Sequence, residues 1–334
     1  MSTIYYDIRK KPFAIYGLDE STTDEFRRIP TSVAENTSKD VLELHKNTAG
    51  GRVRFKTNSN SVSIRVKLEE IDQFPFGTPA LICGFDLYLD REGNKHDFLC
   101  SFPFEFDKRF DYESTRYLPI GEKELTLNMP LYGNILSLEI GLEEGATLLP
   151  HSPYKYEKPI VFYGSSITQG SVTRAGKLYS ANISRKLDTN FKCLGFSGSC
   201  KAEDAIVEYL ASLEMSAFVS DYDHNAPSPE YLRDTHFKLY QKIREKHPNI
   251  PYFMITKPDF RYDDADTARR CIIMESYIKA YNSGDKNVYF IDGSAFFNGV
   301  DLLDCTVDAV HPGDDGQRKM ADYIGDVISK AMKI

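Results

Sequence analysis

The chain has 334 residues, of which 41% are hydrophobic and 27% are charged, a composition typical of a globular protein and not of a disordered one. This length is large for one compact core and predicts two domains. The formal net charge of -8 argues against a strongly basic surface, so we expect no nucleic-acid partner.

The sequence also indicates a cellular compartment. Charged residues occur among the first dozen positions and no apolar segment follows them, so we expect no secretory signal. No apolar stretch approaches the roughly 20 residues that a membrane-spanning helix requires. The six cysteines are scattered and form no C-x-x-C pair, which is typical of free thiols in a reducing compartment and not of a disulfide framework or a zinc site. We therefore expect a cytoplasmic protein without a membrane partner.

The first half of the chain shows a hydrophobic period of two, from about residue 53 to residue 142. Residues 61–68 alternate strictly between polar and apolar side chains, the pattern of a strand with one buried face. Further strands are expected at 85–89, 125–129 and 135–140, with turns at 90–95 and 130–134. Many short strands with little helical signal predict an all-β sandwich, of which the jelly roll is one form.

Between residues 142 and 159 the composition changes to Glu, Gly, Pro and Ser without periodicity, which indicates a linker. This segment contains Leu148-Leu149-Pro150 and Pro153-Tyr154-Lys155-Tyr156, so it is too apolar for a flexible tether. We therefore expect domains at residues 1–157 and 158–334 whose relative orientation is fixed by packing.

The second half alternates between short apolar segments and helices. The apolar segments are 160–163, 193–196, 217–220, 252–255 and 288–291. The expected helices are 175–187, 202–215, 229–246, 267–283 and 316–332. Five buried strands alternating with helices predict an α/β fold with a doubly wound parallel sheet.

Polar residues follow the first three of these strands, where a parallel sheet binds its ligands. The first strand leads into Gly164-Ser165-Ser166-Ile167-Thr168, a turn that exposes a hydroxyl near a helix N-terminus. After the second strand, Gly198 lacks a side chain and can aim its backbone N–H into the site. The third strand is followed by the polar cluster 221–225, which ends in Asn225.

Asp308 lies three residues before His311, shortly before the last helix. A carboxylate at this spacing can accept the imidazole Nδ1–H and leave Nε2 free to act as a base toward a serine. All of these polar residues are expected at the same edge of one sheet.

Together the four segments resemble the four blocks of the SGNH/GDSL hydrolases, in the same order, over roughly residues 159–334. The resemblance implies a three-layer, flavodoxin-like fold, with Ser166 as nucleophile, His311 as general base and Asp308 orienting the base. It also implies an oxyanion hole made by the backbone N–H groups of Ser166 and Gly198 and the side-chain amide of Asn225. Neither a metal nor a cofactor is implied.

Two departures from the family pattern stand in the sequence. The usual Gly-Asp-Ser is Gly164-Ser165-Ser166, so the aspartate, which is not a triad member, is absent. The block around Asn225 lacks the common Gly-x-Asn-Asp form, and Asn225 could instead be a turn residue that binds its own backbone.

A β-rich half followed by such a domain is similar to two-domain bacterial carbohydrate esterases with an N-terminal jelly roll. This similarity implies a carbohydrate O-acetylesterase whose partner is an acetylated oligosaccharide or a smaller ester. The chain has no tryptophan, so any stacking on a sugar falls to its 21 Tyr and 21 Phe residues.

Several alternatives remain open at this point. Ser197 competes as nucleophile but lacks the G-x-S-x-G elbow. Asp221, Asp223 and His224 suggest a metal site, although no second ligand cluster accompanies them. A lipid esterase or acyl-thioester hydrolase is the rival enzyme, and a catalytically inactive glycan-binding protein is the rival from another class. The oligomeric state, including a homo-oligomer, is not determined by the sequence.

Overall fold

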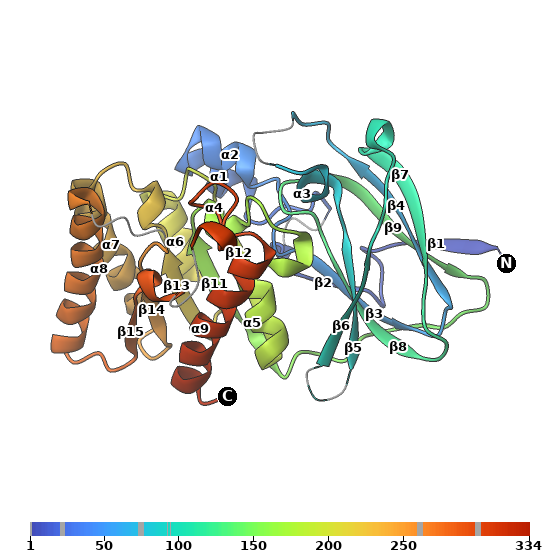
Figure 1. The fold of residues 1–334 in the computed structure, drawn as a ribbon. Coiled ribbons are helices and arrows are strands. Elements are labelled where there is room, and N and C mark those ends of the chain that lie inside the picture. The colour runs from blue at the N-terminus through green and yellow to red at the C-terminus, as the bar shows by residue number, and fades with distance from the viewer. Residues whose placement is uncertain are drawn as a thin grey trace.

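The computed structural model shows a β-rich part and an α/β part packed side by side (Figure 1). The residues that it describes are 2–20, 24–72, 77–91, 93, 95–258, 263–297 and 302–334.

The β-rich part consists of two antiparallel sheets. The first has the order β1-β9-β4-β7 and the second the order β10-β3-β8-β5-β6, with β2 also paired to β3. The strands are β1 (Thr3–Asp7), β2 (Ala14–Tyr16), β3 (Arg52–Thr57), β4 (Ser61–Leu68), β5 (Asp86–Arg91), β6 (Lys95–Ser101), β7 (Asp111–Tyr117), β8 (Lys123–Asn128), β9 (Ile135–Glu143) and β10 (Leu148–Leu149). A short helix, α3 (Pro79–Cys83), lies between β4 and β5.

The strand expected at residues 61–68 is confirmed as β4. Val62, Ile64 and Val66 are buried in the core and Arg65 and Lys67 are exposed, whereas the polar Ser61 and Ser63 are buried as well. The inward face packs because β-branched side chains fit a pleated, half-buried surface.

The α/β part is built on a five-stranded parallel sheet with the order β12-β11-β13-β14-β15. This is the flavodoxin-like order 2-1-3-4-5, so the predicted fold class is confirmed. The strands are β11 (Tyr156–Gly164), β12 (Thr189–Gly195), β13 (Ala217–Asp221), β14 (Tyr252–Ile255) and β15 (Val288–Ile291). The helices are α4 (Ser166–Gln169), α5 (Tyr179–Leu187), α6 (Asp204–Ser212), α7 (Pro229–Lys246), α8 (Asp264–Asn282) and α9 (Asp314–Met332).

Helices cover both faces of this sheet and form the outer layers (Figure 1). One face packs against α5 and α9, and its core is continuous with the core of the β-rich part. The other face packs against α6, α7 and α8 in a second core. Within the described residues, no helix has the combination of length and apolar character needed to cross a membrane.

The structure differs from the sequence-based expectation in three connecting segments. The helix expected at 175–187 begins as a 3-10 turn, Ala175–Lys177, before α5. The expected linker 142–159 contains the end of β9, the short β10 and the start of β11, and residues 150–155 between them lie in no helix or strand. The turn at 130–134 joins β8 and β9, which belong to different sheets, so this connection crosses the sandwich.

The turn expected at 90–95 falls partly outside the described residues, since residues 92 and 94 are not described. The strands on either side pair directly, with Arg91 opposite Lys95, so β5 and β6 form a hairpin.

Part of the N-terminal half belongs by packing to the α/β layers. Helix α1 (Thr31–Thr37) lies beside α6 and packs against α2 (Lys39–Leu44), and Ile29, Ala34 and Val41 are buried in the second core. The domain boundary at residue 157 stays a prediction. The packing shows that residues on both sides of it build the layer that covers this face of the sheet.

Two buried arginines from the N-terminal half close the free edge of β12. Arg28 donates through Nη1 to the carbonyls of Gly195 at 2.5 Å and Cys193 at 3.3 Å. Arg52 donates through Nη1 to the carbonyl of Phe191 at 3.3 Å. These carbonyls alternate along β12 and would otherwise be available to another strand, which is a hazard of sheet edges.

The first prediction concerns these contacts. We expect residues 158–334 expressed alone to be insoluble, or active on small esters but impaired on the natural substrate, because removal of residues 1–157 exposes the β12 edge and part of the shared core. Solubility, size-exclusion profile and esterase activity should be compared with those of the full chain. A monodisperse fragment with full activity on small and oligomeric esters would show that the N-terminal half is a dispensable module.

Candidate active site

The proposed nucleophile lies on a sharp strand-to-helix turn. β11 ends at Gly164, and the Ser165 Oγ caps the next helix by accepting the Ile167 N–H at 3.2 Å. Ser166 is the first residue of α4, where backbone N–H groups have no acceptor within the helix. Gly164 is required at this turn, because a Cβ there would lie 2.1 Å from Thr168 Oγ1 and 2.4 Å from the Asp221 carbonyl oxygen.

Ser166, His311 and Asp308 form one continuous hydrogen-bonded chain. The Ser166 Oγ lies 2.8 Å from His311 Nε2, and His311 Nδ1 lies 2.7 Å from Asp308 Oδ2. If Nδ1 carries the proton that Asp308 accepts, Nε2 is free to take the serine proton. The imidazole contacts Ser166 and not the rival Ser197.

The loop around Asp308 fixes the carboxylate. Its Oδ1 accepts the backbone N–H groups of His311 at 2.7 Å and Val310 at 3.1 Å. The intervening Ala309 adopts a φ of 65°, which folds the chain back over the carboxylate. Burial alone would raise the pKa of Asp308, but the hydrogen bonds from His311 outweigh it and lower that pKa. The carboxylate therefore stays charged beside the imidazole.

Gly198 and Asn225 lie beyond β12 and β13, the strands that flank β11. Gly198 has a φ of 72°, and a Cβ there would meet no atom within 4 Å, so the apex of this loop is open. Asn225 Oδ1 accepts the Cys200 N–H at 3.2 Å. Because this bond identifies the oxygen of the side-chain amide, the Nδ2 group points away from Cys200. Their roles in an oxyanion hole stay a prediction.

The acidic cluster after β13 is bound by protein donors. Asp221 Oδ2 accepts from Thr168 Oγ1 at 2.9 Å and Tyr179 Oη at 3.1 Å, and Asp223 Oδ2 accepts the Lys257 N–H at 3.0 Å. Burial, followed by the Asp223 carboxylate, raises the pKa of Asp221 to about 7. No group of three or more His, Cys, Asp or Glu side chains is arranged to hold a metal ion in the part of the chain that the structure describes.

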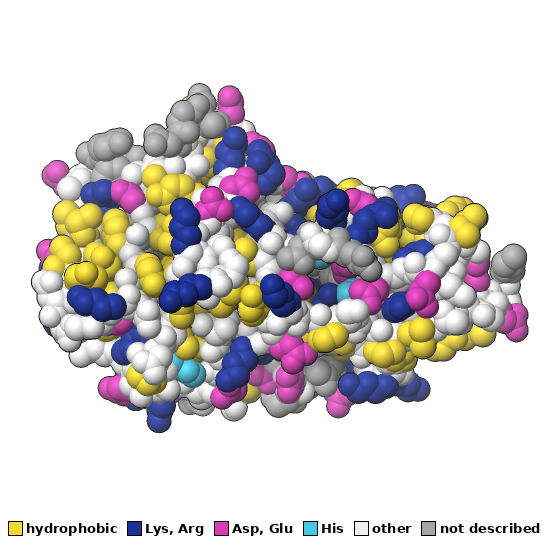
Figure 2. Space-filling model, turned by 90° about the horizontal axis from the view of Figure 1, so that it is seen from below, with side chains coloured by type: hydrophobic (Ala, Val, Ile, Leu, Met, Phe, Trp, Pro, Cys, Tyr) yellow, Lys and Arg dark blue, Asp and Glu magenta, His cyan; other side chains and the backbone are white. Residues whose placement is uncertain are grey.

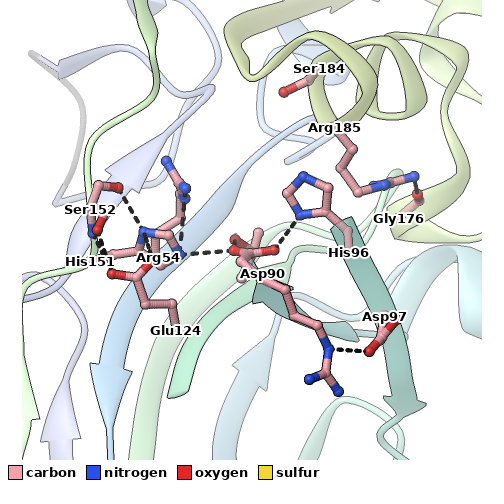
Figure 3. Close-up of polar contacts among 12 residues, drawn as sticks. Arg54, Asp90, His96, Asp97, Glu124, His151, Ser152, Gly176, Ser184 and Arg185 are labelled. Atoms are coloured by element: carbon pink, nitrogen blue, oxygen red, sulfur yellow. Dashed lines mark hydrogen bonds and ion pairs between the residues drawn. The ribbon is translucent and has the colours of Figure 1, made fainter. Parts of the chain in front are cut away.

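A separate polar hollow of about 600 Å³ lies on the second sandwich sheet, and none of the five predicted site residues lines it. Beside it Asp90 accepts from His96 Nδ1 at 2.7 Å and contacts His151 Nε2 at 2.8 Å (Figure 3). Although burial would raise the pKa of Asp90, the hydrogen bonds from His151 and His96 lower it.

Two other charges of this hollow are also paired internally, with Lys56 2.7 Å from Glu122 and Arg91 2.5 Å from Asp97, whereas Nε and Nη1 of the buried Arg54 have no hydrogen-bond partner among the described residues. We therefore interpret the hollow as a structural ion network. Figure 2 shows a similar mixture over a whole face of the molecule, where basic and acidic side chains are interspersed.

Sequence reasoning missed a salt-bridge chain that joins the sandwich to the His311 loop. Arg174 Nη1 lies 3.5 Å from Asp86 Oδ2, and Arg174 Nε donates to Asp314 Oδ2 at 2.9 Å. Asp314 begins α9, three residues after His311. The sequence feature that could have indicated this contact is the segment Gly84-Phe85-Asp86-Leu87-Tyr88, in which an aspartate interrupts an apolar strand.

A flavodoxin-like parallel sheet with a Ser–His–Asp chain at its carboxyl edge defines a serine esterase of the SGNH type. A family model described as "GDSL-like Lipase/Acylhydrolase family" matches residues 157–329, and a model for the N-terminus of SGNH hydrolase-type esterases matches residues 3–148. The chain belongs to the GDSL-like lipase/acylhydrolase family.

Solved structures give the same result for the whole chain. A protein from Bacteroides ovatus described as a GDSL-like lipase has 29% identity and a TM-score of 0.88, over 100% of this chain and 99% of that one. The salicylyl-acyltransferase SsfX3 of a tetracycline biosynthetic pathway has 18% identity and a TM-score of 0.79, over 96% and 95%.

A family two carbohydrate esterase from Clostridium thermocellum, solved with cellohexaose, has 16% identity and a TM-score of 0.63, over 85% of this chain and 93% of that one. The similarities to the acyltransferase and to the carbohydrate esterase show the fold alone, because their identities are 18% and 16%. No curated protein matches the chain.

The second prediction tests the orientation of the base. We expect Asp308→Asn to lower kcat by about 10²–10⁴, because an amide no longer favours the His311 tautomer with Nδ1 protonated. Steady-state kinetics on p-nitrophenyl acetate measure the effect. An unchanged kcat would mean that another group orients the ring.

The third prediction concerns Asp221. Its folded-state pKa of about 7 lies above the roughly 3.9 of an unfolded aspartate, so the free energy of unfolding falls as the pH rises through this interval. Asp221→Asn removes this titration. We therefore expect the Tm of Asp221→Asn minus the Tm of the unchanged protein to become more positive as the pH increases from 5 to 8. The exposed Asp234→Asn is the control, and a pH-independent difference for Asp221→Asn would refute the assignment.

Proposed function

We propose that this esterase is a carbohydrate O-acetylesterase in which Ser166, His311 and Asp308 form the catalytic triad. The observation that carries the proposal is the chain of two short contacts, 2.8 Å from Ser166 Oγ to His311 Nε2 and 2.7 Å from His311 Nδ1 to Asp308 Oδ2. This is the geometry that a base-activated serine requires.

The mechanism that we infer has two acyl-transfer steps. His311 takes the Ser166 proton while the hydroxyl oxygen attacks the ester carbonyl carbon. The tetrahedral oxyanion is stabilised by the N–H groups of Ser166 and Gly198 and by the Asn225 amide. His311 then protonates the leaving alcohol, and an acetyl group remains on Ser166. Water, deprotonated by His311, releases acetate and restores the serine. These steps involve no group other than the chain's own residues, substrate and water.

The preference for a small acyl group rests on the shape of the site. The loop of Gly198 beside the site is open, because a Cβ at its apex would meet no atom within 4 Å. Long acyl chains bind in deep apolar pockets, whereas an acetyl group can be held at an open strand-end face. The fold shared with a carbohydrate esterase solved with cellohexaose supports a sugar as the alcohol part.

Two further parts of the proposal concern the cellular compartment of the protein and the fold of its N-terminal half. The six cysteines are all free thiols, which supports the reducing, cytoplasmic compartment that we propose. The two antiparallel sheets of the N-terminal half support a jelly-roll-like sandwich.

The fourth prediction tests the nucleophile and the substrate together. Ser166→Ala should lower kcat by at least about 10³ without a matching loss of Tm, because loss of a triad member removes most of the chemical acceleration. The same assay on p-nitrophenyl acetate, butyrate and octanoate and on acetylated xylo- and manno-oligosaccharides should favour the acetyl esters.

Three outcomes would contradict this proposal in different ways. Full activity of Ser166→Ala would exclude the nucleophile. A preference for octanoate would indicate a lipid esterase. Failure of the unchanged protein to react with a fluorophosphonate probe and with every ester would indicate an inactive glycan-binding protein.

A further inference from the structure

The loop that carries Gly198 is held by bonds on either side of its apex and not by packing at the apex. No acceptor in the described part of the chain binds the Gly198 N–H, and the space beside its Cα is empty. The neighbouring Ser197 N–H, in contrast, donates to Gln169 Oε1 at 3.0 Å. The Ser199 N–H donates to the Phe196 carbonyl at 2.9 Å and closes a turn over Ser197 and Gly198. The direction of the Gly198 N–H therefore depends on this turn and on the bond that anchors it to Gln169.

Gln169 is well placed to control this loop. It is fully buried and ends α4, the helical turn that begins at Ser166. Its backbone N–H donates to the Ser165 carbonyl at 3.0 Å, so the side chain is attached rigidly to the serine turn. One side chain thus fixes the spacing between the two backbone segments whose N–H groups form the proposed oxyanion hole.

The orientation of the Gln169 amide is set from the N-terminal half. Gln169 Nε2 donates to Asn47 Oδ1 at 2.9 Å, and Asn47 Nδ2 donates to Asn134 Oδ1 at 2.8 Å and to the Tyr132 carbonyl at 3.0 Å. Because the Tyr132 carbonyl can only accept, Asn47 must present Nδ2 to it and Oδ1 to Gln169. Gln169 must then present Oε1 to Ser197. All three amides are buried, so a wrong orientation would leave unpaired polar groups in the core.

The base of the same loop is held by a second N-terminal residue. Arg28 donates to the carbonyls of Cys193 and Gly195, the last residues of β12 before the loop, and its guanidinium lies 4.7 Å from the centre of the Phe196 ring. The N-terminal half thus contacts the base of the loop directly through Arg28, and it acts on the apex indirectly through Asn47, whose partner Gln169 of α4 binds Ser197.

We propose that Gln169 and Asn47 are positioning residues that orient the Gly198 N–H toward the oxyanion through Ser197. This inference rests on the proposed esterase mechanism and adds to it a contribution from the N-terminal half. Neither side chain touches the substrate. Their effect is exerted on the transition state, because the oxyanion forms only there.

The size of the effect can be bounded. Removal of an oxyanion-hole donor outright costs about 10²–10³ in kcat. Loss of the Gln169 bond leaves the Gly198 donor in its turn but removes the bond that anchors this turn to α4, so we expect a reduction in kcat of about 10- to 100-fold with KM changed by less than about threefold.

The experiment compares two buried glutamines. Gln169→Met keeps the volume of the side chain and removes the bond to Ser197. Gln317→Met is the matched control, because Gln317 is equally buried and bonds Ile167 and Tyr179 but not the Gly198 loop. We expect both variants to lose Tm and Gln169→Met alone to show the large loss of kcat on p-nitrophenyl acetate.

Inhibition by phenylboronic acid, which forms a tetrahedral adduct with a serine, separates positioning from general destabilisation. The inhibition constant of Gln169→Met should rise by the same factor by which its kcat falls. Asn47→Leu should reproduce the effect in part, and the double variant should be no worse than Gln169→Met, because both changes act through one bond.

The proposal is overturned if Gln169→Met retains kcat within about twofold, or if Gln317→Met loses as much kcat as Gln169→Met. It is also overturned if the losses of kcat caused by Asn47→Leu and by Gln169→Met add in the double variant. Failure of the esterase mechanism itself is recognised separately, by activity of Ser166→Ala.

Discussion

The free edge of β12 is the constraint on which the catalytic half depends. A parallel sheet leaves alternate carbonyls of its edge strand without partners, and here Arg28 and Arg52 bind three of them. Both guanidinium groups are buried, and burial lowers the pKa of Arg28 to about 10, yet neither contacts a carboxylate. A buried cation is tolerated when neutral acceptors replace its lost water, and the β12 carbonyls act as those acceptors. The edge and the arginines therefore stabilise each other, and the sheet is completed by residues that precede it by more than 100 positions.

This arrangement explains why the two parts form a single catalytic body. Gly50 approaches β12 so closely that a Cβ would lie 2.7 Å from the Cys193 Cβ, and its φ of 78° also favours glycine. Tyr154, in the connecting segment, accepts a hydrogen bond from Arg52 Nε at 2.7 Å. The connecting segment is thus bound to the same arginine that covers the strand.

The sequence allowed prediction of features that local periodicity or spacing encodes. The five parallel strands and most helices follow from runs of apolar residues, and Ser166, Gly198 and Asn225 follow from what stands directly after those runs. The pairing of Asp308 with His311 was predictable because it spans one turn of chain. The contact of His311 with Ser166, 145 positions away, required in addition the topology of a parallel sheet and the family resemblance.

The remaining features are long-range contacts of residues that look ordinary in the sequence. A buried Asn47 or Gln169 has the same letter as a solvated one, and no period marks Arg28 as the residue that caps a strand 165 positions later. The packing of the connecting segment, residues 142–159, shows a related limit. Its composition is that of a loop, but a two-residue pairing of β10 with β3 and the burial of Tyr154 are decided by tertiary structure.

Long-range contacts also determine where charged groups lie around the candidate site. Arg28 brings a positive charge to the end of β12, next to the loop of Gly198. Asp221, the acidic residue at the end of β13, has its pKa raised to about 7 by burial and by Asp223. Ser166 itself is the first residue of α4, where its backbone N–H has no acceptor within the helix. A carboxylate that remains charged, Asp308, lies behind the imidazole, where the proposed mechanism has an imidazolium form. Under that mechanism, negative charge lies where a cation would develop and the positive charge of Arg28 lies near the loop proposed to bind the oxyanion, so the arrangement depends on residues from both halves of the chain.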